Sequence, residues 1–389
     1  MEVLFISHKY PPSVGGMQKQ SYELIHGFEQ AHKVHKIVHD SQESKLSFLL
    51  GLKKRIRALI KQNPGIQIVH CNDGVCAFFC KWIRKEYGIP VILTFHGLDL
   101  LWPNGFYQRA LPRLINNFDG IICVSDFTAE ECLKRGFAKD KVNVVYNGVD
   151  LNSEYETINV DNGLLETFRN LKNKGKRILI SIGRPVRRKG FSWFISNVLP
   201  SLGDDYHYII IGPGTEFSAF QRLLFMIMPS SMLKQLNLLF GWSTDQDQLK
   251  ALGSDPSFSE SFSWFHKLSY DSILFGLDQS DLFIMPNIQV AGDAEGFGLV
   301  ALESNVQGTF VMAANIDGIP SAVTDNRNGW LIESQNAKAW QDKLQNFFAM
   351  EPEQQDAKAR AAQKYVRKNY SWAKMVEAYE DVFRKYLNN

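Results

Sequence analysis

The sequence predicts an α/β protein with two doubly wound, Rossmann-like domains, and three observations lead to that prediction. The chain has 389 residues, more than one hydrophobic core usually supports, so two domains are expected. Short runs rich in β-branched residues alternate with longer amphipathic runs, which is typical of βα units around a parallel sheet. The alternation stops at the polar, irregular stretch Leu151–Lys176 and then begins again, which indicates a second sheet.

Composition and charge exclude several classes of protein. Hydrophobic residues make up 45% and charged residues 22% of the chain, as in ordinary globular enzymes, so neither disorder nor a fibrous repeat is indicated. The net charge of +2 and the lack of a long basic stripe give no reason to expect nucleic acid as a partner. Five cysteines, an odd number without a CxxC pair, are expected to be reduced thiols in a cytosolic protein.

No stretch predicts export or a membrane span. The first run, Met1–Ser7, is too short and too acidic for a signal peptide and has the pattern of a strand. The densest apolar run, Leu223–Met228, ends at Pro229, well short of the roughly 18 apolar residues that a span requires. A cytoplasmic protein that does not cross a membrane is therefore expected.

The first half of the chain predicts one parallel sheet. Helical patterns at Gln18–Gln30 and Phe48–Gln62 separate short β-rich runs. The six predicted strands are Val3–Ser7, Val34–His39, Gln67–His70, Val91–His96, Gly120–Ser125 and Val142–Asn147. Because ligands of such sheets bind beyond the carboxyl ends of the strands, the residues just after each run are the candidates for function.

Two of those strand ends carry candidate binding residues. Gly15 and Gly16 follow the first run and precede a helix, where backbone N–H groups are available to an anion; a plain turn is the alternative. His96 ends the fourth run beside a glycine. It is either a structural histidine or a donor to a substrate hydroxyl or phosphate.

The helical pattern Leu46–Asn63 is basic and amphipathic. Two interpretations remain open for it: a surface helix with a solvated charged face, or a helix that docks on anionic lipid headgroups. Its cations are Lys53, Lys54, Arg55, Arg57 and Lys61, beside the apolar residues Leu49, Leu52, Ile56, Leu59 and Ile60.

The second half predicts a second parallel sheet. Its strand candidates are Arg177–Gly183, Tyr206–Gly212, Leu238–Gly241, Asp281–Asn287, Thr309–Asn315 and Gly329–Glu333. Between Phe217 and Gly276 the periodicity is weak: Met232–Phe240 has the pattern of core-facing structure, and Ser254–Ser263 that of an inserted loop. The chain ends with the helical stretch Pro352–Asn369 and a last amphipathic helix through Leu387.

The first strand of this half is followed by a pair of cations. Arg184 and Lys189 stand five positions apart across a turn, and such a pair can bracket a diphosphate, with a planar fork from arginine and a point charge from lysine. The intervening Arg187 and Arg188 are expected to be solvated.

The segment Asp293–Glu303 has the strongest pattern of a site. Gly296 and Gly298 lie between a buried run ended by Pro286 and a restarting helix, so the backbone there can approach an anion closely. Glu295 on the loop and Glu303 one turn inside the helix can accept hydrogen bonds from hydroxyl groups. Anion donors beside hydroxyl acceptors suit a phosphorylated sugar, whereas an acid near a helix N-terminus plus an exposed glutamate is the plainer alternative.

Taken together, these motifs resemble a known family. Two tandem doubly wound domains with an acidic pair after a late strand are similar to the GT-B glycosyltransferases, specifically the retaining glycosyltransferase family 4, also known as glycosyl transferases group 1. The resemblance covers nearly the whole chain. It is carried by Pro12–Met17, Thr94–Gly97, Tyr146–Asp150, Gly183-Arg184 with Lys189-Gly190, and the E-x7-E pair Glu295 and Glu303.

The resemblance implies how the donor is held. Arg184 and Lys189 would bind the donor diphosphate and neutralise the charge that grows on the leaving nucleoside diphosphate, without a metal ion or other cofactor. Glu303 would bind the ribose hydroxyls, and Glu295 would lie against the donor sugar as one of two catalytic residues.

The remaining implied residues complete the donor contacts. Gly298 and Leu299 would offer N–H groups to the donor sugar or the phosphates. His96, the second catalytic residue, would contact the sugar near its anomeric carbon, and Gly16 would contact the phosphates. Members of the family transfer a sugar with retention, commonly explained by attack on the face from which the diphosphate leaves, so the donor phosphate would act as the base and no protein nucleophile is needed.

The resemblance also implies a domain organisation. Residues 1–165 would form the acceptor-side domain, 166–370 the donor-side domain, and 371–389 a helix that returns to the first domain, with the two domains facing across a cleft that substrate closes. Two departures leave sugar and acceptor undefined: Asp317–Ser321 stands where many relatives have Gly-Gly-x-Pro-Glu, and Leu249–Phe275 is longer than usual.

The predicted function is transfer of a hexose-type sugar from a nucleoside-diphosphate sugar to a hydroxyl of a glycan. The expected acceptor is a lipid-linked saccharide of a cell-surface polysaccharide. A peripheral contact with the inner face of the membrane is the second interpretation of the basic helix. Two alternatives from other classes are kept. One is a nucleotide-sugar epimerase or phosphorylase with the same architecture, and the other is a non-catalytic subunit that binds nucleotide sugars.

Overall fold

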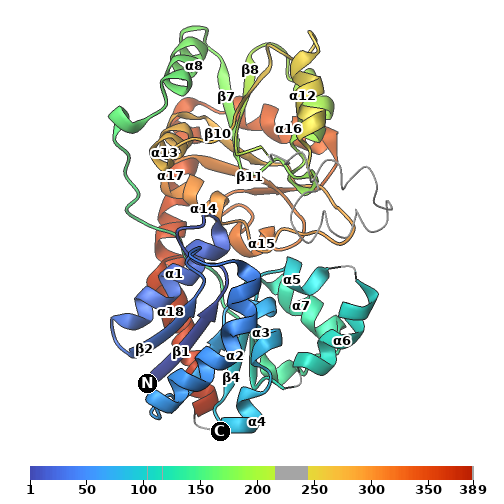
Figure 1. Ribbon diagram of the computed structural model, residues 1–389. Coiled ribbons are helices and arrows are strands. Elements are labelled where there is room, and N and C mark those ends of the chain that lie inside the picture. The colour runs from blue at the N-terminus through green and yellow to red at the C-terminus, as the bar shows by residue number, and fades with distance from the viewer. Residues whose placement is uncertain (103, 116, 215–243, 388–389) are drawn as a thin grey trace. The chain divides into compact units, whose positions relative to one another are not determined.

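A computed structural model of the chain describes residues 1–102, 104–115, 117–214 and 244–387. The chain divides into two compact units (Figure 1). Unit 1 contains Met1–Val149 and Tyr370–Asn389, and unit 2 contains Asp150–Asn369. Each unit is built on one six-stranded sheet, and every strand pairing within the described residues is parallel. The α/β fold with two doubly wound domains is therefore confirmed.

Unit 1 has the strand order β2-β1-β3-β4-β5-β6. The strands are β1 Glu2–Ser7, β2 Lys33–Val38, β3 Ile68–Cys71, β4 Val91–Phe95, β5 Gly120–Cys123 and β6 Val142–Val144. The helices are α1 Gly16–Glu29, α2 Lys45–Gln62, α3 Gly74–Cys80, α4 Ile83–Tyr87, α5 Leu98–Leu101, α6 Gly105–Ile115, α7 Asp126–Lys134 and α18 Trp372–Leu387, with a 3-10 turn η1 at Lys139–Lys141.

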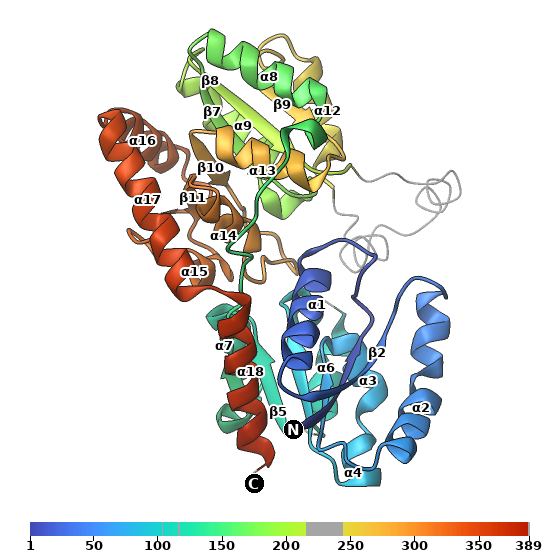
Figure 2. The same ribbon diagram turned by 90° about the vertical axis from the view of Figure 1, so that its left-hand side faces the viewer.

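Side chains of the unit 1 strands alternate between two cores. On β1, Leu4 and Ile6 pack with α2, α3 and α7, whereas Val3 and Phe5 pack with α1 and α18. This is the two-residue period of a strand that is buried on both faces. Helices therefore cover both faces of the sheet (Figure 2).

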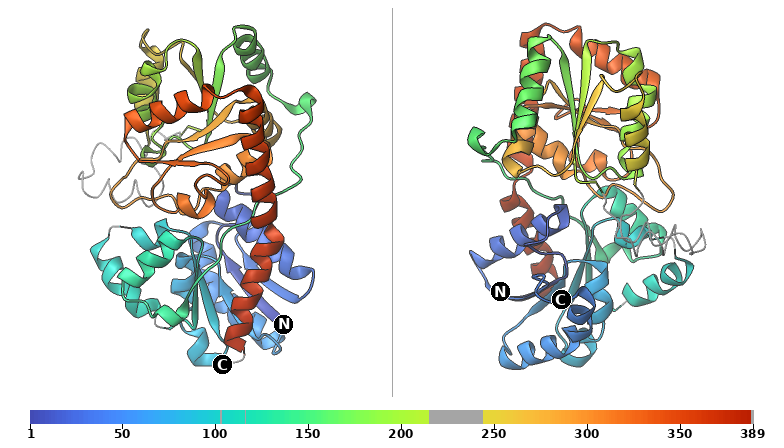
Figure 3. Two further views of the ribbon diagram at one scale, coloured as in Figure 1. Left: turned by 180° about the vertical axis from the view of Figure 1, so that it is seen from behind. Right: turned by 45° about the horizontal axis from the view of Figure 1, so that its top comes forward.

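The C-terminal helix α18 is part of unit 1. Its residues Met375, Tyr379 and Phe383 are spaced four apart on one face and are buried against the first sheet. Figure 3 shows α18 in red along this sheet. Its entry is fixed by the segment after β6, since Val149 N–H donates to Tyr370 O over 3.2 Å. A Cβ at Gly148 would lie 2.4 Å from Trp372 N, so only glycine fits this crossing.

Unit 2 has the strand order β12-β11-β10-β7-β8-β9. The strands are β7 Arg177–Ile182, β8 Tyr206–Ile211, β9 Phe262–Phe265, β10 Leu282–Met285, β11 Phe310–Ala314 and β12 Trp330–Ile332. The described helices are α8 Asn162–Asn173, α9 Phe191–Asn197, α12 Gln246–Ser254, α13 Tyr270–Gln279, α14 Leu299–Val306, α15 Ile319–Ala322, α16 Ala337–Phe348 and α17 Pro352–Asn369, with 3-10 turns η2 Thr157–Asn159, η3 Arg187–Lys189 and η4 Leu199–Ser201.

The unit 2 sheet is also buried on both faces. One core joins Leu179, Ile210 and Ile284 of the strands to α9, α12 and α16, and Trp340 of α16 is fully buried in it. The other core joins the alternate strand residues, such as Ile180, to α8, α13 and α14. The strand ends are thereby held rigidly, and the loops that leave them are the parts free to form a site.

Three expectations differ from the structure in unit 2. The expected irregular stretch Leu151–Lys176 contains helix α8, which Asp161 caps by accepting a hydrogen bond from Leu164 N–H over 3.0 Å. The expected loop Ser254–Ser263 ends in the edge strand β9, whose four residues pair with β8. The domain boundary lies at Val149/Asp150 rather than after residue 165, because α8 packs on the second sheet.

Several sequence predictions fall on residues that the structure does not describe. These are the predicted strand Leu238–Gly241, the core-facing pattern Met232–Phe240 and the apolar run Leu223–Met228, all of which lie outside the described residues. Among the helices of the described ranges, none is both long enough and apolar enough to span a bilayer.

Candidate functional site

In both units the strand order reverses beside the first strand. β1 lies between β2 and β3 in unit 1, and β7 lies between β8 and β10 in unit 2. At such a switch point, the loops after neighbouring strands leave to opposite faces of the sheet, and open α/β sheets bind ligands there. The candidate residues are therefore those after β1 and β3 in unit 1, and those after β7 and β10 in unit 2.

Four cations follow β7 in the loop that contains η3. Arg184 and Arg187 are exposed, whereas the side chains of Arg188 and Lys189 are only 19% and 11% exposed. Three of the four, Arg184, Arg188 and Lys189, interact with the carboxylates after β10. The loop touches the end of the neighbouring strand: Gly190 has a φ of 67°, and a Cβ there would lie 2.1 Å from Pro286 O. Only glycine permits this approach, which brings the cations to the carboxyl end of β10.

Two carboxylates that follow β10 pair with these cations. Lys189 Nζ lies 2.7 Å from Glu295 Oε2, and Arg188 Nε lies 3.4 Å from the same oxygen. Arg188 Nη1 lies 3.3 Å from each carboxylate oxygen of Asp293. The amide of Asn287 donates a further hydrogen bond to Glu295 Oε2 over 3.3 Å. The loops after β7 and β10 are thus joined by one network of charges.

The network fixes the protonation state of Glu295. Burial alone would raise the pKa of Glu295, but the charges of Lys189 and Arg188 outweigh burial and lower the pKa to about 2. Burial lowers the pKa of Lys189, and the charge of Glu295 offsets only part of this effect. At neutral pH Glu295 is therefore an anion with little affinity for a proton, which makes it a poor general base.

The three cations also act on one another. Partial burial, followed by the charge of Arg188, lowers the pKa of Arg184. For Arg188, the lowering of the pKa by burial is outweighed by the charges of Glu295 and Asp293, and the pKa is raised. Arg184, Arg188 and Lys189 therefore repel one another beside the carboxylates of Asp293, Glu295 and Asp317, and an added anion would reduce the repulsion among the cations.

Asp317 holds the backbone of the Glu295 loop. Its Oδ2 accepts a hydrogen bond from Glu295 N–H over 3.1 Å, and Gly318 N–H donates to Glu295 O over 2.9 Å. A Cβ at Gly318 would lie 2.1 Å from Gly296 O, so the two loops meet backbone to backbone. Burial raises the pKa of Asp317 to about 6 although it accepts this hydrogen bond.

Helix α14 begins directly after that loop. Gly298 precedes it with a φ of 102°, and a Cβ there would lie 3.2 Å from Met285 Cε, which favours glycine. Since Gly298 has no side chain to cap the helix, the first N–H groups, beginning with Leu299, depend on other partners. Glu303 lies about one turn inside the helix and is half-buried.

The structure corrects one prediction here and adds residues that sequence reasoning missed. Arg188 was expected to be solvated, but the turn η3 directs it inward to Asp293 and Glu295, while Arg187 stays exposed. Asp293 and Asp317 were not predicted as site residues, although each begins a segment that the sequence singled out, Asp293–Glu303 and Asp317–Ser321. Their positions after β10 and β11 are the structural feature that places them at the site.

In unit 1, His96 follows β4 with a defined tautomer. Its Nε2 lies 2.9 Å from Asn72 O. A carbonyl oxygen only accepts, so we assign the proton to Nε2, which leaves Nδ1 as an acceptor. Burial lowers the pKa of His96 to about 4, so the ring is neutral at pH 7. In this tautomer Nδ1 can only accept a hydrogen bond, so it could bind a hydroxyl group as an acceptor but not donate to one as predicted from the sequence.

Asp99 holds the backbone around His96. Its Oδ1 accepts from the N–H groups of His96 and Gly97, each over 3.0 Å, and its Oδ2 accepts from Gly74 N–H over 3.3 Å. Burial nevertheless raises the pKa of Asp99 to about 7. The loops after β3 and β4 are therefore joined by one carboxylate.

Two further predictions concern helices of unit 1. Gly16 is the first residue of α1, and Gly15 before it has a φ of 156° and no side chain to cap the helix; an anion site and a plain turn both fit this geometry. In α2, Leu52, Ile56 and Ile60 are buried in the core of unit 1, and Arg57 donates two hydrogen bonds, over 2.9 and 2.7 Å, to Glu86. The charged face of α2 is therefore partly neutralised by its own unit.

The structure places the predicted site residues in two groups. In unit 2, Arg184 and Lys189 lie in the loop after β7, and Glu295 lies after β10 in contact with Lys189. Gly298, Leu299 and Glu303 continue from that loop into α14. Gly16 and His96 lie in unit 1, each after the carboxyl end of a strand.

Comparison with protein families supports the reading of both units. Residues 14–153 match the model of Glycosyltransferase Family 4, and residues 165–364, about half of the chain, match the model of Glycosyl transferases group 1. A D-inositol 3-phosphate glycosyltransferase of Mycolicibacterium smegmatis is 30% identical over 335 residues, which cover 83% of this chain and 68% of that protein.

A second relative and a solved structure extend the comparison. A putative colanic acid biosynthesis glycosyltransferase, WcaL, of Salmonella typhimurium is 24% identical over 272 residues, which cover 68% of this chain and 57% of that protein. The Anabaena protein HepE, solved in complex with UDP-glucose, has a TM-score of 0.71 at 15% identity and covers 99% of this chain and 100% of that one. At this identity the structural similarity shows the fold.

Proposed function

Because the chain belongs to the glycosyl transferases group 1 family, we propose that it transfers a hexose-type sugar from a nucleoside-diphosphate sugar to a hydroxyl group of a glycan acceptor. The observation that carries this proposal is the cluster of Arg184, Arg188 and Lys189 against Asp293 and Glu295 at the switch point of unit 2. A site with clustered cations beside carboxylates suits a diphosphate that is attached to a polyol.

The donor diphosphate is assigned to Arg184 and Lys189, with Arg188 as a third cation nearby. Exposed Arg184 can turn its planar fork to the phosphate oxygens, while buried Lys189 supplies a fixed point charge. These charges would stabilise the leaving nucleoside diphosphate, so no metal ion or other cofactor is required by the proposal. Glu303 binds the ribose hydroxyls in this assignment.

The sugar is assigned to the loop before α14. Glu295 accepts hydrogen bonds from the sugar hydroxyls as an anion, and the N–H groups of Gly298 and Leu299 face the sugar or the phosphates. The low pKa of Glu295, about 2, supports a role in binding and charge stabilisation rather than in proton transfer at neutral pH. The donor phosphate is then the base for the attacking hydroxyl, which accounts for transfer with retention.

Unit 1 is assigned the acceptor side and two contacts to the donor. His96, neutral and with Nδ1 as an acceptor, would bind a hydroxyl of the transferred sugar. Gly16 would bind the phosphates through its backbone. The acceptor is proposed to be a lipid-linked saccharide in cell-surface polysaccharide synthesis, which the relative named for colanic acid biosynthesis supports.

A peripheral contact of unit 1 with the inner face of the membrane is proposed through α2. Exposed Lys53, Lys54 and Lys61 and the exposed apolar residues Leu46 and Leu50, at 67% and 68%, are suited to anionic headgroups. Co-sedimentation with anionic vesicles should be lost at high salt and in a Lys53→Gln, Lys54→Gln double variant. Equal sedimentation with neutral and anionic vesicles would contradict this contact.

The donor assignment is tested by calorimetric titration of the full chain with a panel of nucleoside-diphosphate sugars in the presence of a chelator. One sugar nucleotide should bind, and Arg184→Ala and Lys189→Ala should each weaken it at least tenfold. Arg187→Ala is the matched control, because it removes an equal charge from the same turn at an exposed position. Equal weakening of donor binding by all three substitutions would mean that binding depends on the net charge of the turn and not on Arg184 and Lys189 in particular.

The same preparation separates transfer from the other enzyme classes. Incubation with the bound donor and no acceptor should give neither a 2-epimer nor a sugar phosphate, whereas added glycan acceptor should release the nucleoside diphosphate. Release of a 2-epimer would identify an epimerase, and consumption of inorganic phosphate a phosphorylase. A donor that binds but is never turned over with any acceptor would favour a non-catalytic subunit.

A further inference from the structure

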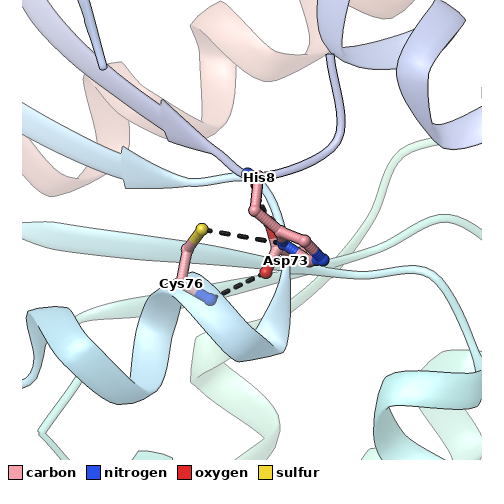
Figure 4. Close-up of side chains that lie close together, drawn as sticks. All are labelled: His8, Asp73 and Cys76. Carbon is pink, nitrogen blue, oxygen red and sulfur yellow. Dashed lines mark hydrogen bonds and ion pairs between the residues drawn. The ribbon is translucent and has the colours of Figure 1, made fainter. Parts of the chain in front are cut away.

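Three side chains with metal-binding atoms meet at the switch point of unit 1. His8 follows β1, Asp73 follows β3, and Cys76 lies in the first turn of α3 (Figure 4). His8 Nδ1 lies 2.9 Å from Asp73 Oδ2 and 3.8 Å from Cys76 Sγ. The three ligand atoms lie within 4.8 Å of one another. The proposed donor site uses none of these three side chains.

The separations are close to those of a tetrahedral zinc site. For Zn–N, Zn–O and Zn–S bonds of about 2.0, 2.0 and 2.3 Å, ligand atoms of a tetrahedron lie roughly 3.3 to 3.6 Å apart. The observed 2.9 Å between nitrogen and oxygen and 3.8 Å between nitrogen and sulfur lie within about half an ångström of that range. The third pair, the carboxylate oxygen of Asp73 and Cys76 Sγ, lies within 4.8 Å, so side-chain rotations that bring the carboxylate and the thiol closer complete the site.

The local fold holds these side chains in place and leaves their metal-binding atoms available. Asp73 caps α3 through Oδ1, which accepts a hydrogen bond from Cys76 N–H over 2.7 Å, so Oδ2 is the oxygen directed at His8. The cap and a metal bond can therefore exist together. Asp73 and Cys76 are buried, whereas the His8 side chain is 10% exposed, which gives an ion a path to the cluster.

The mixed chemistry of the three side chains decides which cations they suit. A buried carboxylate, an imidazole and a thiol form a mixed set that excludes hard cations such as Mg²⁺ and Ca²⁺, which prefer oxygen ligands throughout. Zinc accepts all three ligand types.

We propose that His8, Asp73 and Cys76 form a zinc site in unit 1, with water as the fourth ligand. On binding, the Sγ–H bond of Cys76 breaks, a Zn–S bond forms and the proton leaves to solvent. His8 binds through Nδ1 with its proton on Nε2, and Asp73 binds through Oδ2. The site places an open coordination position at the edge where sheets of this topology bind ligands, and it does not depend on the proposed donor.

The test uses Co²⁺ as a spectroscopic substitute for Zn²⁺ on the chelator-treated full chain. The wild type should give a thiolate-to-cobalt charge-transfer band at one equivalent, which Zn²⁺ abolishes and Mg²⁺ does not. Cys76→Ser should remove the band. His8→Gln should keep a weakened band. Its affinity for Co²⁺ should fall by more than about 100-fold, which is the most that loss of a contact supporting a ligand costs.

Cys132→Ser is the matched control. Cys132 is another buried thiol of unit 1, 3.5 Å from Cys123 Sγ on the far side of β4, and its substitution should leave the band unchanged. Zn²⁺ should also raise the melting temperature of the wild type and of Cys132→Ser but not of Cys76→Ser. No band in the folded wild type, or a band that persists in Cys76→Ser, would overturn the proposal and leave Asp73 as a helix cap alone.

Discussion

The two switch points have the same topology but opposite chemistry. In unit 2, loops after the first strand and its neighbour bring three cations against two carboxylates. In unit 1, the equivalent loops bring His8 to Asp73, and neighbouring Asn72 to His96, without an arginine or lysine in these contacts. The sheet therefore fixes where a site forms, and the loop residues decide which ligand it suits.

The way each carboxylate is held shows the difference most clearly. Glu295 in unit 2 is held by the charges of Lys189 and Arg188, which a bound anion can redirect. Asp99 in unit 1 is held by three backbone N–H groups, which cannot leave without unfolding their loops. Unit 2 is thus arranged to exchange one anion for another, whereas unit 1 is arranged to hold fixed positions.

The largest effect is expected from Lys189→Ala. In the proposed reaction, removal of this buried cation would take away a point charge from the leaving diphosphate, and it leaves Glu295 with Arg188 and the Asn287 amide. We expect kcat/KM to fall by about 100- to 1000-fold, as when one preorganised charge-stabilising donor is removed. Steady-state assays beside Arg187→Ala check this, and a loss of similar size in the control would remove the distinction between buried and exposed cations.

Glu295→Gln is expected to separate diphosphate binding by the unit 2 cations from the contribution of the Glu295 carboxylate to turnover. Nucleoside diphosphate without a sugar should bind as tightly as before or more tightly, because the anion that competes for Lys189 is gone. Turnover should fall by about 100-fold, and the free energy of unfolding at pH 7 by about 3 kcal/mol, because two buried cations lose a partner. Calorimetry and urea titration measure both, and weaker binding of the bare diphosphate would contradict this account.

The same substitution has a pH signature. The pKa of Glu295 is about 2 in the folded chain, below its ordinary value of 4.5, so its contribution to stability is present above about pH 4.5 and is lost as the pH falls toward 2. Unfolding measured between pH 5 and 2.5 should show a smaller acid loss in Glu295→Gln than in the wild type. An equal loss would show that other carboxylates dominate acid unfolding.

The sequence predicts the strands that position both sites better than it predicts the side-chain contacts within them. Eleven of the twelve strands in the described part of the chain were predicted with ends within three residues of those observed, because both sheets are buried on two faces and their runs are strongly apolar. The exception is β9, an edge strand of four residues in a stretch rich in serine, where the pattern is too short to distinguish from a loop.

Which side chains meet in each site depends on the direction in which they point and on the order of the strands in the sheet. Neither can be predicted from the residues next to them in the sequence. Arg187 and Arg188 are adjacent and chemically equal, and only the turn η3 decides that Arg188 points inward. His8 and Asp73 are 65 positions apart, and they meet because β1 and β3 are neighbours. Glu295 could be predicted because its glycine-rich loop marks a strand-to-helix junction.

Tyr379→Phe tests whether unit 1 is a fixed frame. The Tyr379 hydroxyl from α18 accepts a hydrogen bond from Gln20 Nε2 over 3.1 Å and lies 3.1 Å from Thr94 Oγ1, while Gln20 Oε1 accepts from the Asn72 amide over 2.7 Å. Loss of the hydroxyl removes both contacts and leaves buried Gln20 Nε2 with only the 3.9 Å contact to Met375 Sδ, whereas Thr94 Oγ1 keeps His70 Nε2; we expect the free energy of unfolding to fall by about 2 kcal/mol.

This network also reaches His96 through Asn72, so the substitution has an enzymatic consequence. KM for the donor should rise while kcat changes little, because Tyr379 positions the strand ends without touching substrate. A conservative change on the same helix face, Phe383→Leu, alters packing without a hydroxyl and serves as the comparison. If both variants change KM equally, general loosening of α18 explains the result rather than the hydrogen bonds.

The smallest effect is expected at Asp317, because its substitution by asparagine leaves the side-chain contacts of both sites in place. Its φ of 54° lies in the left-handed region, which asparagine tolerates, so Asp317→Asn keeps the backbone and an oxygen for Glu295 N–H. The pKa of Asp317 is raised to about 6 from 3.8, so the folded chain holds its proton longer than the unfolded chain, and stability falls as the pH rises from about 4 to 6.

A shift of this size would correspond to about 3 kcal/mol for a fully buried group, and solvent around half-buried Asp317 reduces this to about 1 kcal/mol. Asp317→Asn should therefore remove that pH dependence and be more stable than the wild type by about 1 kcal/mol at pH 8. Urea titrations at pH 4 and pH 8 measure the difference. A variant less stable than the wild type at pH 8 would mean that the charge of Asp317 is needed to hold the Glu295 loop, and the unit 2 site would then depend on a third carboxylate rather than on two.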